Sequence, residues 1–332
     1  MADKYDPTPR GNYYIAASGA AIGLAYGLSI RYGSRLFPNN PVFQVMTLSF
    51  MFFLPFAMGF ITIFIVERRR PQPIWIWFLL PWLPVAAGEA ATAAALWEGV
   101  ICIVMFAPIA LGASSLGGAA AGAIVRFVRS RRPSEASLVC VMCLPLLLSS
   151  FEPRLLLHQE LRNVESVIDI AAPPATVWQN IERVPRISSA ELSSSWSQTI
   201  GFPDPVEATL SAEGVGGIRH ATFAGGVLFI ETIDVWEPER RLGFSIRADQ
   251  IPKTTLDEHV TVGGKFFDVL YGEYLLEQLP NGQTRLHLLS RHRVSTDFNW
   301  YAHLWTDAVM SDLQRRILLV VKNRSEILRN SP

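Results

Sequence analysis

Two hydrophobic patterns divide the chain near residue 157. Before this point, long apolar stretches are separated by short arginine-rich connections. After it, apolar and polar residues alternate in short runs that end at glycine, proline or asparagine. A long apolar stretch is typical of a membrane-spanning helix, whereas alternation with period two is typical of a half-buried strand. The pattern predicts an α-helical membrane bundle over residues 1–157 and an α+β domain over residues 158–332.

The first region has room for four or five membrane helices, because a span takes about 20 apolar residues and its backbone must hydrogen-bond internally. The expected spans are residues 13–30, 42–66, 74–97, 100–125 and 138–150. The last stretch is short, contains Pro145 and is followed by Glu152. It is expected either to cross the membrane or to lie at its interface, so the sequence leaves four and five spans open.

Arginine clusters set the expected orientation of the bundle. Arg68, Arg69 and Arg70 follow the second span, and a second cluster lies between residues 126 and 132. The positive-inside rule places both loops, and with them the N-terminus, on the cytoplasmic side of a bacterial-type inner or plasma membrane. Five spans would put the C-terminal domain outside the cytoplasm, and four would leave it inside.

Small residues recur at every fourth position in two of the spans. This spacing flattens one face of a helix and lets two backbones approach closely in lipid. The residues are Gly19, Gly23 and Gly27 in the first span and Ser114, Gly118 and Gly122 in the fourth. They predict either packing of these two spans within the chain or a homodimer through Gly19, Gly23 and Gly27.

Glu89 places a carboxylate inside the third span, where an ionised group is unfavourable and often functional. One interpretation is that the side chain snorkels to the membrane surface or forms an interhelical hydrogen bond, and the other is a role in transport or proton relay. Internal repeats and broken helices, which are typical of transporters, are not evident in the sequence. The bundle is therefore interpreted as an anchor.

The second region predicts an antiparallel sheet that is closed by a long helix. A strand over residues 164–171 is followed by a helix over 175–184. Further strands are expected over residues 207–212, 217–224, 227–236, 242–247, 266–279 and 284–294. A final helix over residues 299–328 carries an apolar residue at every fourth position from Tyr301 to Val321, and this stripe must pack on an apolar surface. We expect a curved sheet around the helix.

The opening of this region, VIDIAAPPATVW from Val167 to Trp178, resembles the SRPBCC superfamily, also called START-like or Bet v 1-like. Three shorter stretches are similar to its polyketide cyclase/dehydrase group: GVGGIR from Gly214, VWEP from Val235 and RLGF from Arg241. The resemblance covers residues 163–325. It implies a helix-grip fold with an apolar cavity for lipids, polyketides, steroids or aromatic compounds, but it names no reaction.

Candidate catalytic residues come from the last predicted hairpin. A two-residue turn at Asn281 and Gly282 would pair Glu273 with Ser290 and Tyr271 with His292. Glu273 and His292 would then be diagonal neighbours, an arrangement suited to acid–base chemistry with Tyr271 beside them. A structural or solvated polar cluster is the alternative interpretation.

The same register gives candidate ligand-binding residues. Leu275, Leu288 and Ser290 would share the face of Tyr271, Glu273 and His292 and would line the cavity. A three-residue turn would reverse the faces and present Tyr274, His287 and Arg291 instead.

Two further segments are candidates for ligand contact. Residues 253–265, which contain His259, form a long connection where a lid over the cavity would lie, although a solvated loop is the alternative. Asn299, Tyr301 and Trp305 open the long helix, where they would pack in the core or line the pocket wall.

The formal charge of zero is the sum of two opposite balances. Of the 29 basic and 29 acidic residues, 12 and 7 lie in residues 1–157, a balance of +5, and the remaining 17 and 22 give −5. An acidic second half gives no reason to expect nucleic acid as a partner. The histidines lack metal-ligand spacing, so neither a metal nor another cofactor is expected.

These features predict membrane-anchored binding of a hydrophobic small molecule or lipid. The enzymatic alternative is a polyketide cyclase/dehydratase-like enzyme or a hydrolase that uses Glu273, Tyr271 and His292. A transporter or sensor with a ligand-binding module is the second alternative.

Overall fold

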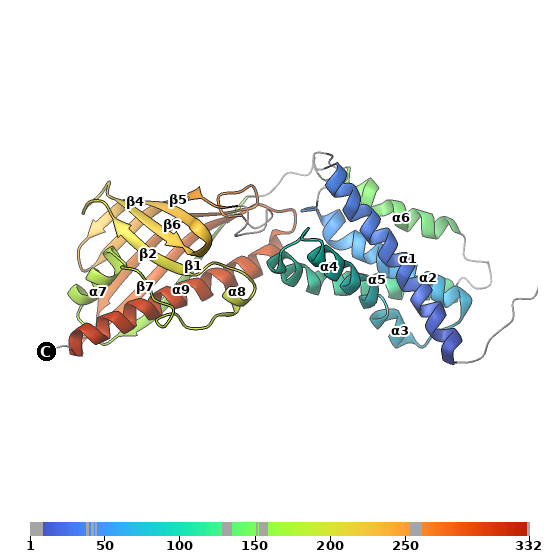
Figure 1. Ribbon diagram of the computed structural model, residues 1–332, viewed down its shortest axis with the longest axis horizontal. Helices are drawn as coiled ribbons and strands as arrows, with labels where there is room; N and C mark the ends of the chain where they lie inside the picture. The colour runs from blue at the N-terminus through green and yellow to red at the C-terminus, as the bar shows by residue number, and fades with distance from the viewer. Residues whose placement is uncertain are drawn as a thin grey trace, which may run out of the picture. The chain divides into compact units, whose positions relative to one another are not determined.

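The computed structural model describes residues 9–37, 40, 43, 45–127, 135–150, 152, 159–252 and 261–330. The chain divides into two compact units, Met1–Leu157 and His158–Pro332. The first unit is helical in its described residues, and the second combines a sheet with helices (Figure 1).

The helices of the first unit follow the predicted apolar stretches. They are α1 (Pro9–Leu36), the π-helical turn η2 (Ser49–Phe53), α2 (Leu54–Arg69), α3 (Ile74–Leu79), α4 (Trp82–Ala94), α5 (Val100–Phe127) and α6 (Glu135–Ser149). Among the described residues, four stretches are long and apolar enough to cross a membrane: Tyr13–Leu36, Ser49–Arg69, Ile74–Ala94 and Val100–Phe127. The shorter α6 is also helical, and whether it crosses stays a prediction.

The glycine stripe of α1 packs on α2. A Cβ atom added to Gly23 would lie 2.5 Å from Thr62 Oγ1, and one added to Gly27 would lie 2.5 Å from Met58 Sδ. Because α2 covers the face of Gly19, Gly23 and Gly27, these glycines have a partner within the chain, and a homodimer stays a prediction that their spacing no longer requires.

The small residues of α5 pack on α2 and α3. A Cβ atom on Gly122 would lie 2.2 Å from the Trp77 ring, and one on Gly59 would lie 2.0 Å from the Ser114 carbonyl oxygen. The predicted packing of the first and fourth spans against each other is therefore wrong. Small-residue spacing specifies a close approach but not its partner, and both stripes find theirs in other helices.

Polar groups join the ends of α2, α3 and α5. Glu67 is 5% exposed. Its carboxylate lies 2.8 Å from Arg126 Nη2 and accepts a hydrogen bond from Trp77 Nε1 at 3.1 Å. Glu89, by contrast, has one buried oxygen with no partner in the described part of the chain, so the interhelical hydrogen bond expected for this residue is not found at that atom.

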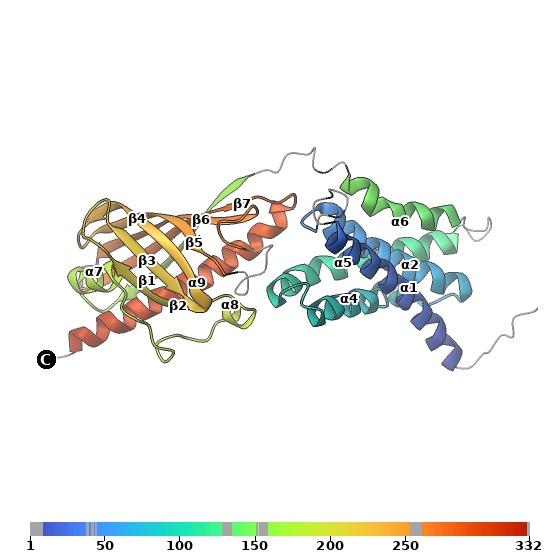
Figure 2. The ribbon, with the colours of Figure 1, turned by 45° about the horizontal axis from the view of Figure 1, so that its top comes forward.

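The second unit is a seven-stranded sheet packed against one long helix, as the alternation and the final apolar stripe predict (Figure 2). Its elements are β1 (Glu160–Ile170), α7 (Pro174–Glu182), α8 (Trp196–Thr199), β2 (Pro205–Leu210), β3 (Ile218–Phe223), η4 (Ala224–Gly226), β4 (Val227–Glu237), β5 (Arg241–Gln250), β6 (Phe267–Gln278), β7 (Thr284–Val294) and α9 (Asn299–Asn330). The strand order is β1-β7-β6-β5-β4-β3-β2, with antiparallel pairing throughout.

Alternate residues of each strand face α9 or face away from it. The face toward α9, here called the inner face, carries Phe244, Tyr274 and Leu288, which form one core with Leu318 and Val321 of the helix. The opposite face, here called the outer face, carries more exposed residues such as Ser245 and Leu275. Burial of the apolar inner face stabilises the domain in proportion to the apolar area removed from water.

The last hairpin has a three-residue turn, so the predicted two-residue turn is wrong. Gln278 pairs with Thr284, and Leu279 N–H donates to Gln283 O at 2.9 Å. Pro280 has no N–H to donate to a tighter ladder, and Gly282 takes a positive φ of 73°, as the last position of such a turn requires. The longer turn shifts β6 by one residue relative to β7.

Candidate functional site

A cavity of about 160 Å³ lies between the inner face of the sheet and α9. Aromatic and aliphatic side chains from the strands, the connecting segments and α9 form most of its wall. Among them are Phe223, Phe229 and Phe244 from the sheet and Val309, Met310 and Ile317 from α9. Period-two alternation in the strands and a three-to-four-residue period in α9 direct these side chains to the same space.

The volume of the cavity limits what it can hold. An apolar cavity of about 150 Å³ accommodates benzene, whereas pockets for drug-sized ligands measure about 300–1,000 Å³. The space in this domain, about 160 Å³, therefore fits one substituted ring or a short acyl segment. A two-chain lipid could enter only in part.

One ion pair lies in the cavity wall. Arg219 of β3 and Glu231 of β4 are direct cross-strand partners, and they are 4% and 7% exposed. Arg219 Nη1 donates to Glu231 Oε2, and Nη2 donates to the Ile181 carbonyl oxygen at 3.3 Å. The guanidinium also lies 5.4 Å from the centre of the Phe244 ring. These contacts fix the guanidinium in a mainly apolar wall.

Burial dominates the electrostatics of this pair. It raises the pKa of Glu231, and the Arg219 guanidinium offsets this effect only in part. Burial also raises the pKa of Tyr274, whose hydroxyl interacts with the same guanidinium. Tyr274 therefore remains a neutral phenol in the cavity wall at physiological pH.

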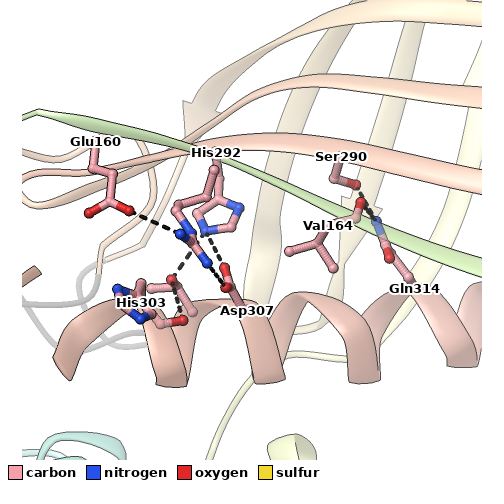
Figure 3. Close-up of polar contacts among 9 residues, drawn as sticks. Glu160, Val164, Ser290, His292, His303, Asp307 and Gln314 are labelled. Atoms are coloured by element: carbon pink, nitrogen blue, oxygen red, sulfur yellow. Dashed lines mark hydrogen bonds and ion pairs between the residues drawn. The ribbon is translucent and has the colours of Figure 1, made fainter. Parts of the chain in front are cut away.

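Gln314 connects α9 to the sheet beside the cavity. Its side chain is 1% exposed, and its Nε2 donates to the Val164 carbonyl oxygen and to Ser290 Oγ, each at 2.9 Å (Figure 3). Its Oε1 accepts from Ser166 Oγ at 2.8 Å. With its amide saturated by these contacts, Gln314 holds the helix at a fixed position over β1 and β7.

His292 lies in a separate polar cluster near the start of α9. The side chain is fully buried, and Nε2 lies 3.1 Å from Thr306 Oγ1 and 3.4 Å from Asp307 Oδ1 (Figure 3). Asp307 Oδ2 also accepts from Arg162 Nη2 at 2.5 Å. Burial lowers the pKa of His292, although Asp307 opposes this change. His292 is not one of the residues that line the cavity.

The structure separates the predicted catalytic residues. Tyr271 and Glu273 lie on the outer face, where the Tyr271 hydroxyl donates to Glu273 Oε2 at 2.6 Å and Arg241 Nη2 lies 2.8 Å from the same oxygen. His292 lies on the inner face. The predicted Glu273–His292 pair is therefore wrong, because the three-residue turn moves the β6 residues to the other face while those of β7 stay.

The same shift divides the predicted ligand-binding residues. Leu288 and Ser290 line the cavity, whereas Leu275 is 40% exposed on the outer face. The alternative set is divided as well: Tyr274 faces the cavity, but His287 contacts Glu165 on the outer face at 2.7 Å. Arg291, its third member, is also exposed on the outer face.

The predicted residues of α9 lie outside the cavity wall. Asn299 Oδ1 accepts from the Thr296 backbone N–H at 2.7 Å and from Thr296 Oγ1 at 2.9 Å, which ties the segment before α9 to the first residue of the helix. The ring centres of Tyr301 and Trp300 are 5.7 Å apart, and those of Trp305 and Trp196 are 6.4 Å apart. His259 lies outside the described residues. Among the residues that are described, no group of three or more His, Cys, Asp and Glu could hold a metal ion.

Arg219 and Glu231 were not predicted as site residues, although the sequence carries a signal for them. Glu231 lies an even number of residues from Val227 and Ile233 in an apolar run. On a strand these three side chains point to the same face, so the carboxylate is expected among core residues. The three residues Ala224–Gly226 join the strands and bring Arg219 opposite Glu231. The sequence pattern that indicates such a pair is a charged residue on the core face of one strand with an opposite charge across the hairpin.

No known family model matches the sequence, and no curated protein matches it. Solved structures are similar to about half of the chain. The Aha1 dimer from Colwellia psychrerythraea is 18% identical over 50% of this chain and 97% of its own, with a TM-score of 0.27. The protein TTHA0849 from Thermus thermophilus is 16% identical over 51% of this chain and 100% of its own, with a TM-score of 0.33.

DynU16, a putative protein in the dynemicin biosynthetic locus, is 17% identical over 47% of this chain and 45% of its own, with a TM-score of 0.28. This chain therefore spans less than half the length of DynU16. Similarity at this level gives no information about a ligand or a reaction of this chain.

Proposed function

We propose that the second unit binds a small apolar compound in its cavity and that the helices of the first unit anchor it in a membrane. The observation that carries the binding proposal is the cavity between the inner face and α9, which is walled mainly by aromatic and aliphatic side chains. A mainly apolar pocket of this kind favours a ligand that is poorly soluble in water.

Four apolar helices of sufficient length support the anchor. Arg68, Arg69 and Arg126 near the ends of α2 and α5 support a cytoplasmic position for those ends and for the N-terminus. An anchor raises the concentration of the binding domain close to lipid, where an apolar compound accumulates. The resemblance to the SRPBCC superfamily, which the opening residues of the domain carry, agrees with this role.

The enzymatic alternative has lost its candidate residues, because Glu273 and Tyr271 lie on the opposite face of the sheet from His292. The hydrogen bonds of Glu273 to Arg241 and Tyr271 give it a structural role on the outer face. We therefore retain binding as the function that the geometry supports best.

Filling the cavity tests the proposal. Ala221 lines the cavity from β3, whereas Ser245 is exposed on the outer face of β5. Ala221→Phe should weaken binding of α-methylstyrene, a one-ring apolar probe, by about tenfold or more, because the new ring takes the space in which the probe would be buried. Ser245→Phe adds the same ring outside the cavity and should leave binding unchanged.

The measurement is calorimetric titration of the full chain in lipid nanodiscs, with empty nanodiscs as the blank. Native mass spectrometry of the detergent-solubilised protein should reveal a co-purified small apolar molecule that Ala221→Phe excludes. Absence of α-methylstyrene binding to the unmodified chain would refute the proposed function.

A further inference from the structure

Two buried donors in the cavity wall lack an acceptor. Arg219 and Arg316 both line the cavity, and their side chains are 5% and 3% exposed. In each guanidinium the Nε–H has no hydrogen-bond partner in the described part of the chain. Among the lining residues that the structure describes, these two nitrogens are the buried side-chain polar atoms without a partner. Folded proteins rarely leave buried donors unsatisfied.

Arg219 is the better placed of the two donors to meet a ligand. Its Nη atoms are held by Glu231 and by the Ile181 carbonyl oxygen, and its Cζ lies over the Phe244 ring. The orientation of Nε is therefore fixed before any ligand enters, so binding would not have to order this side chain. A guanidinium has no acceptor site, so it can recognise only an acceptor atom.

The charges of the wall decide what kind of acceptor fits. Arg219 already contacts Glu231, and Arg316 Nη2 lies 2.5 Å from Asp204 Oδ1. Glu207 also lines the cavity. A ligand carboxylate would add an uncompensated negative charge to a mainly apolar space, and this is unfavourable. A ketone, ester or amide oxygen can accept a hydrogen bond without adding charge.

We propose that the cavity selects a neutral, one-ring-sized compound with a carbonyl oxygen, and that Arg219 Nε–H donates a hydrogen bond to this oxygen. The inference rests on the proposed function and narrows it to a class of ligand. The aromatic wall holds the apolar part, and the Arg219–Glu231 pair supplies a donor without a net charge. Arg219 is then a specificity-determining residue.

Two probes of the same shape test the donor. Acetophenone carries the carbonyl oxygen, and in α-methylstyrene a methylene group replaces that oxygen. Their intrinsic hydrophobicities differ, so each probe is compared between protein variants and not with the other probe. Binding is measured by calorimetric titration of the full chain in nanodiscs, with empty nanodiscs as the blank.

Arg219→Met combined with Glu231→Leu removes the pair without leaving one buried charge behind. We expect acetophenone to bind this variant about tenfold more weakly than the unmodified chain, because a hydrogen bond to a charged donor is lost. Binding of α-methylstyrene should stay the same. The matched control, Arg241→Met with Glu273→Leu, removes an ion pair from the outer face of the same sheet and should change neither probe.

Glu231→Gln tests the charge argument. This variant keeps Arg219 but removes the carboxylate, so the guanidinium can compensate an anionic ligand. Benzoate should then bind about tenfold more tightly than to the unmodified chain, since it gains a charge-assisted contact, while acetophenone should bind as before.

The outcomes separate this inference from the proposed function. If α-methylstyrene binds but acetophenone affinity is unchanged in the Arg219→Met, Glu231→Leu variant, the cavity function stands and the inference is wrong. Equal losses for both probes, or benzoate that binds Glu231→Gln no more tightly than the unmodified chain, would also overturn it. If neither probe binds the unmodified chain, both proposals fail.

Discussion

The two faces of the sheet carry the same kind of ion pair in different surroundings. On the inner face, the side chains of Arg219 and Glu231 are 5% and 9% exposed. On the outer face, those of Arg241 and Glu273 are 41% and 15% exposed, with 2.8 Å between charged atoms. Both pairs join neighbouring strands, so the main difference between them is access to water.

This difference decides what each pair contributes. Breaking an exposed ion pair changes the free energy of unfolding only slightly, because water solvates the charge that remains. Removing one partner of a buried pair leaves a charge without solvent or counterion. The inner pair therefore constrains the cavity wall, whereas the outer pair, which water reaches, should contribute little to the free energy of unfolding.

Arg219→Met alone should have the largest effect on stability. It leaves Glu231 buried and unpaired, and we expect a loss of about 3–5 kcal/mol in the free energy of unfolding. The measurement is denaturant unfolding of the full chain in detergent. Adding Glu231→Leu should recover most of the loss. A single variant as stable as the unmodified chain would show that the inner pair is solvated, and the contrast between the faces would fail.

His292 of β7 extends the comparison to the pH dependence of stability. His292 on the inner face is fully buried, and burial lowers its pKa below the ordinary value. As the pH falls below about 6.5, the unfolded chain binds a proton at this residue before the folded chain does, so the folded state loses stability. The contribution of His292 is therefore fully present above that pH and declines below it.

His292→Phe should remove this decline, which amounts to at most about 1.4 kcal/mol per pH unit for one proton. Unfolding of the full chain at pH values from about 5 to 8 measures it, as the difference between variant and unmodified chain at each pH. The free energy of unfolding of the variant should increase relative to that of the unmodified chain as the pH falls. A difference that is constant with pH would mean that His292 titrates alike in both states.

Arg241→Met should have the smallest effect. We expect a change of about 0–1 kcal/mol in the free energy of unfolding, because Glu273 can be solvated at the outer face and keeps its hydrogen bond from Tyr271. The same unfolding measurement applies, and high salt should reduce the effect further. A loss as large as that of Arg219→Met would erase the distinction between the faces.

The elements of both units could be predicted because local pattern determines them. The strand over residues 284–294 has the predicted bounds, and α9 begins at the predicted Asn299. The apolar stretches of the first unit are helical as expected. The predictions of which elements contact each other were wrong in two places. The glycines of α1 pack on α2, and the turn of the last hairpin has three residues, which changes the register of β6 and β7.

The candidate site depended on that turn. One additional residue in it left Leu288 and Ser290 at the cavity but moved Tyr271, Glu273 and Leu275 to the outer face. Because side chains alternate with period two, a one-residue error reverses a whole strand. The prediction of which β6 residues line the cavity was therefore much less reliable than the prediction of the strand itself.

The sequence by itself determined the apolar helices, the strands and the long final helix, since each follows from the period of its own residues. Only the tertiary structure decided which polar groups meet. Arg219 and Glu231 lie 12 residues apart on two strands, and Gln314 contacts Val164 and Ser290 across large separations in the chain. Such contacts depend on register and on the seating of a helix, which no local pattern specifies. The cavity and its unsatisfied guanidinium donors arise from these contacts, because burial is a property of the packed domain as a whole.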